Sequence, residues 1–260
     1  MLIDSHCHLN YPGLVENQQA VLERARAAGV SLMVAIGTKR AEWAEVTALA
    51  EREADVYATV GIHPHEAERH PDVEAAELVA ASHHPKVIGI GETGLDYFYD
   101  KSPRERQQDN FRAHIRASQH TGLPLIVHTR DAETDTLEIM KEAMGQGPFT
   151  GVIHCFTASQ SFADQALALG FYISLSGILT FKNATDLQAT ASTLPLNRVL
   201  VETDSPYLAP VPMRGKACEP AFVVHTNAML AKLQNHTAEQ MAAITTANFY
   251  ALFTKAPKPL

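Results

Sequence analysis

Short apolar runs alternate regularly along the chain with longer stretches of helical spacing, and few folds accommodate this pattern. Runs rich in Val and Ile, flanked by Gly, Pro or polar residues, are typical of buried parallel strands. We predict strands at Leu2–His8, Ser31–Gly37, Val56–His63, Val87–Glu92, Leu125–His128, Gly151–His154, Phe171–Ser176 and Val199–Asp204. Helices are predicted in the gaps and after the last strand, at Val15–Ala28, Arg40–Glu53, Val73–Ser82, Pro103–Thr121, Ala132–Met144, Ser159–Leu169, Ala184–Thr193, Pro220–Leu233 and Thr237–Phe253.

Alternating strands and helices predict βαβ units and a parallel sheet. The chain has 260 residues, which matches the size of a (β/α)8 barrel, about 250 residues. We therefore predict an α/β fold, a (β/α)8 TIM barrel formed as a single domain over residues 1–260. An open doubly wound sheet and a division into two domains are the alternatives. No unusual apolar stripe remains after the helices are assigned, so we expect a monomer without an obligate protein partner.

Side chains that can bind metal gather at the predicted strand ends. The carboxyl ends of all strands in such a barrel meet at one mouth, which is where active sites lie. Positions that are far apart in the sequence therefore converge on one small volume. The candidate metal ligands at these ends are His6, His8, Glu92, His128, His154 and Asp204.

The spacing of these residues supports a shared site. Side chains alternate along a strand, so we expect His6 and His8 to face the same way and Cys7 to face away. The same alternation is expected to group Glu202 with Asp204, and His63 with His65. Two imidazoles at positions i and i+2 can chelate one cation, and a carboxylate between two cations can bridge them.

A purely structural role is the simpler explanation for any one of these residues. A lone histidine at a strand end is more often hydrogen-bonded than metal-bound, and Glu202 with Asp204 could belong to a salt bridge. However, carboxylates and imidazoles crowded at one mouth are costly to keep ionised together without cations. The cysteines Cys7, Cys155 and Cys218 form no C-x-x-C pair and indicate neither a disulfide framework nor a cysteine zinc site. We therefore predict a divalent metal centre.

Several motifs together resemble the TatD family of metal-dependent deoxyribonucleases, a family of the wider amidohydrolase-like barrel superfamily. The resemblance extends from Asp4 to about Phe253, nearly the whole chain. It rests on His6-Cys-His8, Gly61-Ile-His-Pro-His65, Gly89-Ile-Gly-Glu-Thr-Gly-Leu-Asp-Tyr97, His128-Thr-Arg-Asp131, His154-Cys-Phe-Thr157 and Glu202-Thr-Asp-Ser-Pro-Tyr-Leu208.

The resemblance implies a barrel of the metallo-dependent hydrolase type with two divalent ions per chain, either Mg, Mn or Zn. By similarity, one ion is held by His6, His8 and Asp204, the second by His128 and His154, and Glu92 bridges both. Many superfamily relatives bridge their ions with a modified lysine, so a glutamate here fits TatD-like enzymes better than typical amidohydrolases. The chain also has Cys218 where the family usually has asparagine, so we expect a changed contact in that loop.

The remaining polar residues of the mouth have expected roles in catalysis and positioning. Asp204 is the expected acceptor of the proton of the attacking water, because it lies beside one ion only. Glu202 is expected to orient a histidine through the free ring N–H, with a salt bridge as the alternative. His63 and His65 are expected to line the pocket and contact phosphate, although either could be a structural hydrogen-bonding residue.

Other side chains near the mouth are candidates for binding substrate. Arg130 could clamp a phosphate oxygen, or pair with Asp131. Tyr97 and Tyr207 offer ring faces on which bases could stack, or they pack a loop.

The charge of the chain limits how it could bind nucleic acid. The formal net charge is -8, whereas proteins that grip long nucleic acids usually have a basic face. The resemblance implies a 3′–5′ deoxyribonuclease acting on single-stranded DNA, and the charge leads us to expect that it holds only short ends, with the metal ions supplying positive charge. We expect it to be cytoplasmic. The alternative is a hydrolase of a small ester, amide, lactone or aminoacyl-tRNA substrate. The complete ligand set argues against a non-catalytic binding protein. No membrane contact is expected, because no run is long enough to span a bilayer.

Overall fold

The computed structural model describes residues 1–258, in which a parallel sheet forms a barrel. Eight strands pair in the order of the chain. They are β1 (Leu2–Cys7), β2 (Val30–Ala35), β3 (Val56–Val60), β4 (Val87–Asp96), β5 (Leu125–Arg130), β6 (Gly151–Ile153), β7 (Tyr172–Leu175) and β8 (Val199–Val201). A parallel bridge between Cys7 and Ser205 links the first and last strand regions. This ring confirms the predicted (β/α)8 barrel over the open sheet.

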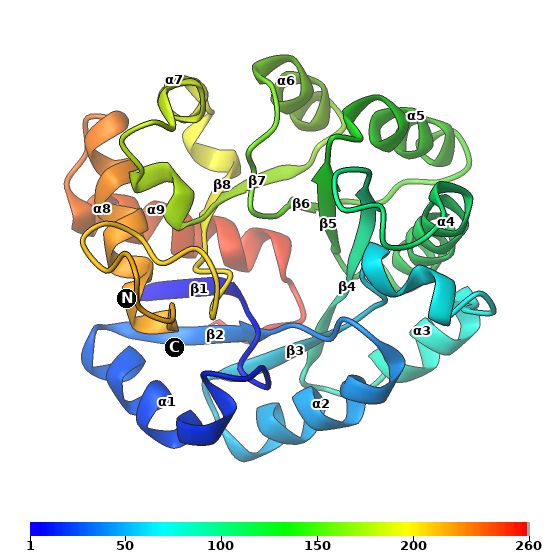
Figure 1. The fold of residues 1–260 in the computed structure, drawn as a ribbon, viewed down its shortest axis with the longest axis horizontal. Coiled ribbons are helices and arrows are strands. Elements are labelled where there is room, and N and C mark those ends of the chain that lie inside the picture. The colour runs from blue at the N-terminus through cyan, green and yellow to red at the C-terminus, as the bar shows by residue number, and fades with distance from the viewer. Residues whose placement is uncertain (259–260) are drawn as a thin grey trace.

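Helices surround the strands in an outer ring (Figure 1). They are α1 (Gln18–Ala27), α2 (Trp43–Arg52), α3 (Ala75–Ser82), α4 (Arg104–Thr121), α5 (Glu133–Met144), α6 (Gln160–Ala168), α7 (Thr185–Thr193), α8 (Val223–Leu233) and α9 (Ala238–Leu252). Short 3₁₀ helices lie in the connections: η1 (Val15–Asn17), η2 (Arg40–Glu42), η3 (Pro64–Arg69), η4 (Gly177–Thr180), η5 (Leu196–Arg198) and η6 (Pro220–Phe222). None of the helices in the described part has the length and apolar character that a membrane crossing requires.

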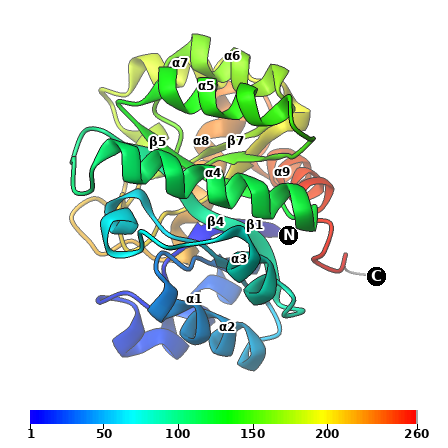
Figure 2. The ribbon, with the colours of Figure 1, turned by 90° about the vertical axis from the view of Figure 1, so that its right-hand side faces the viewer.

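The interior of the barrel and the layer beneath the helices form two apolar cores. Along β2, Val34 belongs to the interior core, whereas its neighbours Met33 and Ala35 pack in the outer layer, as alternation along a strand requires. The interior core also includes Phe249 and Phe253, from α9 and the residue after it. Figure 2 shows α9 at the end of the barrel away from the loops that follow the strands. This helix therefore closes the amino-terminal end, and the opposite mouth stays open.

Several strand ends differ from the prediction. Strand β4 extends to Asp96 instead of Glu92, because its last residues pair with β5 up to Arg130. In contrast, β3 and β8 end before the polar residues that were assigned to them. His63 lies in extended backbone just before η3, and Asp204 has a positive φ of 55°. These two residues therefore reach the mouth from turns, and strand alternation is not the reason for their direction.

Candidate metal centre

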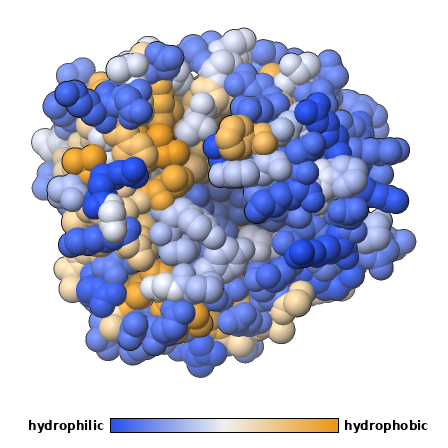
Figure 3. Space-filling model, viewed as in Figure 1, coloured by the Kyte–Doolittle hydropathy of each residue, from blue (hydrophilic) through white to orange (hydrophobic). Residues whose placement is uncertain are grey.

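The candidate ligands lie at the carboxyl ends of the strands, on the face that Figure 3 shows hollowed near its centre. Backbone hydrogen bonds hold the two sides of this mouth together. The Asp204 amide donates to the His6 carbonyl at 3.0 Å, and the His8 amide donates to Ser205 at 2.8 Å. The loop after β8 is thereby fixed beside β1, which brings Asp204 next to the two histidines.

Glu92 lies at the centre of the cluster and its side chain is almost fully buried. One carboxylate oxygen, Oε1, is 2.8 Å from His154 Nε2, and 3.3 Å from both His63 Nε2 and His128 Nδ1. The other oxygen, Oε2, is 3.4 Å from His6 Nε2 and 3.8 Å from the Nε2 atom of His8. A single carboxylate therefore faces two separate groups of imidazole nitrogens, as a bridging ligand would.

The position of Glu92 depends on the glycine before it. The pairing of β4 with β5 shifts register between Ile90 and Thr93. Gly91 has a φ of 134°, and a Cβ there would lie 2.7 Å from the Ile126 carbonyl oxygen. Only glycine fits this close approach in this backbone conformation, so Gly91 allows the strand to turn Glu92 into the barrel.

The first group of ligand atoms comes from β1 and the loop after β8. His6 Nε2 and His8 Nε2 are 3.3 Å apart. Asp204 Oδ1 lies 3.3 Å from His8 Nε2 and 3.6 Å from His6 Nε2. Glu92 Oε2 is buried there and has no hydrogen-bond partner within residues 1–258. Convergent imidazole nitrogens beside an unpaired carboxylate oxygen match the donor set of a divalent cation, so these residues fit a metal ion.

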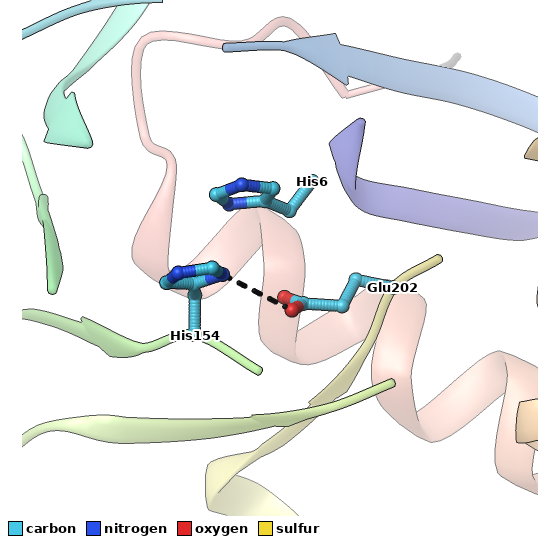
Figure 4. A group of neighbouring side chains, drawn as sticks. All are labelled: His6, His154 and Glu202. Atoms are coloured by element: carbon cyan, nitrogen blue, oxygen red, sulfur yellow. Dashed lines mark hydrogen bonds and ion pairs between the residues drawn. The ribbon is translucent and has the colours of Figure 1, made fainter. Parts of the chain in front are cut away.

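The second group is formed by His128 and His154, each held from behind by a carboxylate. His154 Nδ1 is 3.3 Å from Glu202 Oε1, and Figure 4 shows Glu202 reaching this histidine while the His6 ring lies over it. His128 Nε2 is 3.1 Å from Asp96 Oδ2. A ring nitrogen that donates to a carboxylate leaves the lone pair on the other nitrogen. The free lone pairs are therefore on His154 Nε2 and His128 Nδ1, the atoms that face Glu92.

His63 has the opposite hydrogen-bonding pattern. Its Nδ1 accepts a hydrogen bond from the His65 backbone amide at 3.1 Å, so the neutral ring carries its proton on Nε2, which faces Glu92. Burial lowers the pKa of His63 to about 4, despite the nearby Glu92 carboxylate, so this tautomer is neutral at pH 7. His63, Glu92 and His128 are close enough to form a metal-binding group, but the proton on Nε2 makes His63 a hydrogen-bond donor.

Asp96 is a site residue that the sequence prediction missed. Its Oδ2 accepts hydrogen bonds from His65 Nε2 at 2.8 Å and from His128 Nε2 at 3.1 Å. Its Oδ1 accepts from the backbone amides of Phe98 and Tyr99. Asp96 is two alternations after Glu92 on the same strand, and this spacing was the available signal.

The charges of the mouth favour bound cations. Glu92 and Glu202 are buried and Asp204 is partly buried, and none of them pairs with a lysine or an arginine within residues 1–258. Burial opposes the ionisation of Glu92, yet the surrounding imidazoles hold its pKa well below the usual value. Burial also opposes protonation of His154, but Glu92 and Glu202 raise its pKa well above the usual value. In the absence of a metal ion, imidazolium thus balances carboxylate, and a cation would replace those protons.

The other predicted substrate-binding residues have varied surroundings. The Arg130 guanidinium lies over the rings of Phe98 and Tyr99, 4.0 and 4.7 Å from their centroids, rather than beside Asp131. The Tyr97 hydroxyl donates to Asp135 at 2.6 Å, and Arg104 covers the ring at 4.1 Å. The structure therefore does not bring Tyr97 to the ligand cluster.

Tyr207 is half-exposed beside the first ligand group, 6.4 Å from the His8 ring between centroids. Cys7 is buried in the outer core, as expected from its direction. Cys218, where a changed contact was expected, is fully buried in a small apolar cluster with Ala209 and Phe222. Cys218 belongs to the connection between β8 and η6, and its burial helps to hold that connection in place.

Comparisons with known proteins identify relatives of this chain. The sequence matches the family described as TatD related DNase over residues 3–254. It is 43% identical over 255 residues to the uncharacterized metal-dependent hydrolase YcfH of Escherichia coli K12, covering 97% of this chain and 95% of that protein. It is 39% identical to the uncharacterized metal-dependent hydrolase YabD of Bacillus subtilis 168, with coverage of 97% and 99%.

Solved structures extend the comparison to the fold. The crystal structure of YjjV, a TatD homologue from Escherichia coli K12, superposes with a TM-score of 0.91 at 31% identity and covers 98% of both chains. A phosphotriesterase homology protein from Escherichia coli shares the fold at a TM-score of 0.67 and 17% identity, with coverage of 97% and 98%. The barrel, the histidine–carboxylate mouth and these matches lead to one conclusion: the chain belongs to the TatD family and is a metal-dependent hydrolase.

Proposed function

We propose that this protein is a 3′–5′ deoxyribonuclease that trims single-stranded DNA ends with a two-ion centre. The main support for this proposal is the position of Glu92 between two groups of imidazole nitrogens. One ion would be held by His6, His8 and Asp204, and the other by His128 and His154, with Glu92 shared. Two divalent ions with two carboxylate ligands leave a net charge of about +2, which suits an anionic phosphodiester.

The residues of the chain have separate tasks in this proposal. When bound, paired ions lower the pKa of water towards about 7 and stabilise charge on the oxygens of the scissile bond. Asp204 accepts the proton of the attacking water, because its side chain is 15% exposed while that of Glu92 is 3% exposed. Burial opposes the ionisation of Asp204, but His8 and His6 keep its pKa below the usual value, so the carboxylate is available as a base at neutral pH. His63, whose Nε2–H faces Glu92, lines the pocket beside the scissile phosphate.

Exposed aromatic rings beside the centre support a single-stranded substrate. Phe98 and Tyr99 are 54% and 51% exposed, and Tyr99 contacts the edge of the His65 ring at 5.3 Å between centroids. Tyr207 is 53% exposed near His8. Unpaired bases stack on such rings with little dependence on sequence, whereas bases inside a duplex have no free faces. The rings therefore favour unpaired ends as the substrate.

The test is a time course on 5′-labelled single-stranded DNA with metal-free protein, and with Mg²⁺, Mn²⁺ or Zn²⁺ restored. The proposal predicts a metal-dependent ladder that shortens from the 3′ end and is abolished by Asp204→Asn. Asp164→Asn, an exposed carboxylate on α6, is the matched control and should keep full activity. Full activity of Asp204→Asn would refute the role given to this residue.

The same protein preparations should be assayed on small carboxylic esters and lactones. The ions would then act on a carbonyl instead of a phosphoryl group. Hydrolysis of these substrates without any DNA cleavage, in protein with two bound equivalents of metal, would refute the nuclease proposal and support the small-substrate alternative.

A further inference from the structure

A polar cavity, separate from the mouth of the barrel, lies between the outer face of α4 and the segment that leads from η3 to α3. Figure 2 faces this side of the molecule, where α4 crosses in front and α3 lies beneath it. The cavity has a volume of about 200 Å³, whereas one water molecule needs roughly 10–15 Å³. The residues that line it include His70, Arg106, Asp109, Asn110, Arg112 and Arg116.

Asn110 lines this cavity with an amide that has no partner. Its side chain is nearly completely buried, at 4% exposure. Neither Nδ2 nor Oδ1 has a hydrogen-bond partner within residues 1–258, and the same holds for the buried Nδ1 atom of His70. Buried polar side-chain atoms in folded proteins are nearly always hydrogen-bonded. Both amide atoms are also closed to solvent, so the Asn110 side chain must turn toward the cavity to pair with a polar ligand.

The cavity carries an excess of positive charge in an acidic protein. Three arginines line it and Asp109 is its acidic lining residue. Arg112 is 3.3 Å from Glu142 on α5, whereas Arg106 and Arg116 form no ion pair in the described part of the chain. Two guanidinium groups are thus free to bind an anion.

We propose that this cavity binds a phosphate monoester. Guanidinium groups present planar forks of N–H donors that match phosphate oxygens in pairs, and two free forks suit a phosphate better than a singly charged carboxylate. Asn110 Nδ2 donates to a phosphate oxygen. After the side chain turns toward the cavity, Asn110 Oδ1 accepts from a hydroxyl of the esterified group.

This site is separate from the metal centre. The inner face of α4 lies against the barrel and buries Phe111 and His114, so the helix stands between the cavity and the ligand cluster. No candidate metal ligand lines the cavity. Ligand binding at α4 can therefore be changed by substitutions that leave the metal ligands in place.

The experiment is a calorimetric titration of the metal-loaded protein with ribose 5-phosphate, and in parallel with inorganic phosphate. Because the metal centre can also bind phosphate, each titration is repeated with Arg116→Gln and Asn110→Leu. Arg52→Gln is the matched control, since Arg52 is exposed at the end of α2 and does not line the cavity. The thermal midpoint without ligand checks folding, and the exposed Arg116 can be replaced even if Asn110→Leu fails to fold.

The proposal predicts one equivalent of ribose 5-phosphate beyond any bound at the metal centre. Binding of this equivalent should weaken about 10- to 100-fold in Arg116→Gln, because a hydrogen bond to a charged group is lost, and should be unchanged in Arg52→Gln. Tighter binding of the ester than of inorganic phosphate, with the difference lost in Asn110→Leu, would support recognition of the hydroxyl group. Identical affinity and stoichiometry in wild type and Arg116→Gln would overturn the proposal.

Discussion

Replacing Asp96 by asparagine should selectively weaken the second metal position. The two oxygens of Asp96 accept four hydrogen bonds: Oδ2 from His65 and His128, and Oδ1 from the amides of Phe98 and Tyr99. An asparagine has one oxygen and one NH₂ group. If the NH₂ faces the histidines, His128 Nε2 must become an acceptor, and its proton moves to Nδ1. If the NH₂ group faces the backbone, the amides of Phe98 and Tyr99 point at another donor and lose their acceptor.

The magnitude follows from the tautomer of His128. A proton on Nδ1 removes the lone pair that faces Glu92 Oε1 at 3.3 Å. Loss of a carboxylate that orients a metal-binding histidine typically costs 10- to 100-fold in metal affinity, which is about 1.4 to 2.7 kcal/mol. His6 and His8 do not touch Asp96, so the ion proposed between them should keep its affinity.

The assay is competition for Zn²⁺ or Mn²⁺ with a chromogenic chelator, which resolves the two binding steps. Asp135→Asn is the matched control, because Asp135 accepts hydrogen bonds from Tyr97 and Gln108 without contacting a histidine. Wild type and the control should bind two ions alike, while Asp96→Asn should lose affinity in one step only. Unchanged affinity in both steps by a folded variant would refute the tautomer argument.

Three further predictions concern pH, stability and substrate affinity. In metal-free protein the raised pKa of His154 contributes stability that is fully present below the ordinary value of 6.5 and is lost as pH rises through the raised pKa. The free energy of unfolding measured in urea should therefore decrease as pH rises above 6.5, and a flat profile would contradict the pairing with Glu92. His114→Leu removes the acceptor of the Ile62 amide at 2.9 Å and should lower the free energy of unfolding by about 1–3 kcal/mol, measured by urea denaturation; an unchanged midpoint would argue against this bond. Phe98→Ala should raise KM for single-stranded DNA about 5- to 150-fold through lost base stacking, while kcat and the hydrolysis of a small phosphodiester stay constant. An equal decrease of kcat/KM on both substrates would exclude stacking.

The sequence predicted the barrel because local pattern and global fold agree in the buried strands. In β2, alternate residues serve the two cores, and the same short apolar runs recur along the chain. The strand ends were less predictable, since glycines usually mark a strand end. Gly94 lies inside β4 instead, where a Cβ would collide with the His128 carbonyl oxygen. The predicted strand therefore ended at Glu92, and Asp96 was not recognised as a residue of the same strand.

The candidate ligands could be listed from the sequence because each lies near the end of a strand. Their directions could not be predicted in the same way. Asp204 lies beyond β8 in a left-handed conformation, and His65 lies in η3, so strand alternation does not apply to them. The protonation pattern of His63 and His128 depends on contacts with His65 and Asp96, which only the tertiary structure brings together.

In the proposed centre Glu92 is shared by two metal ions. The most direct measurement is anomalous scattering from crystals of the Mn²⁺-loaded protein. We expect two peaks roughly 3.5–4 Å apart, one beside His6 and His8 and the other beside His128 and His154, with Glu92 between them. A single peak at saturating Mn²⁺, or a second peak away from Glu92, would contradict it.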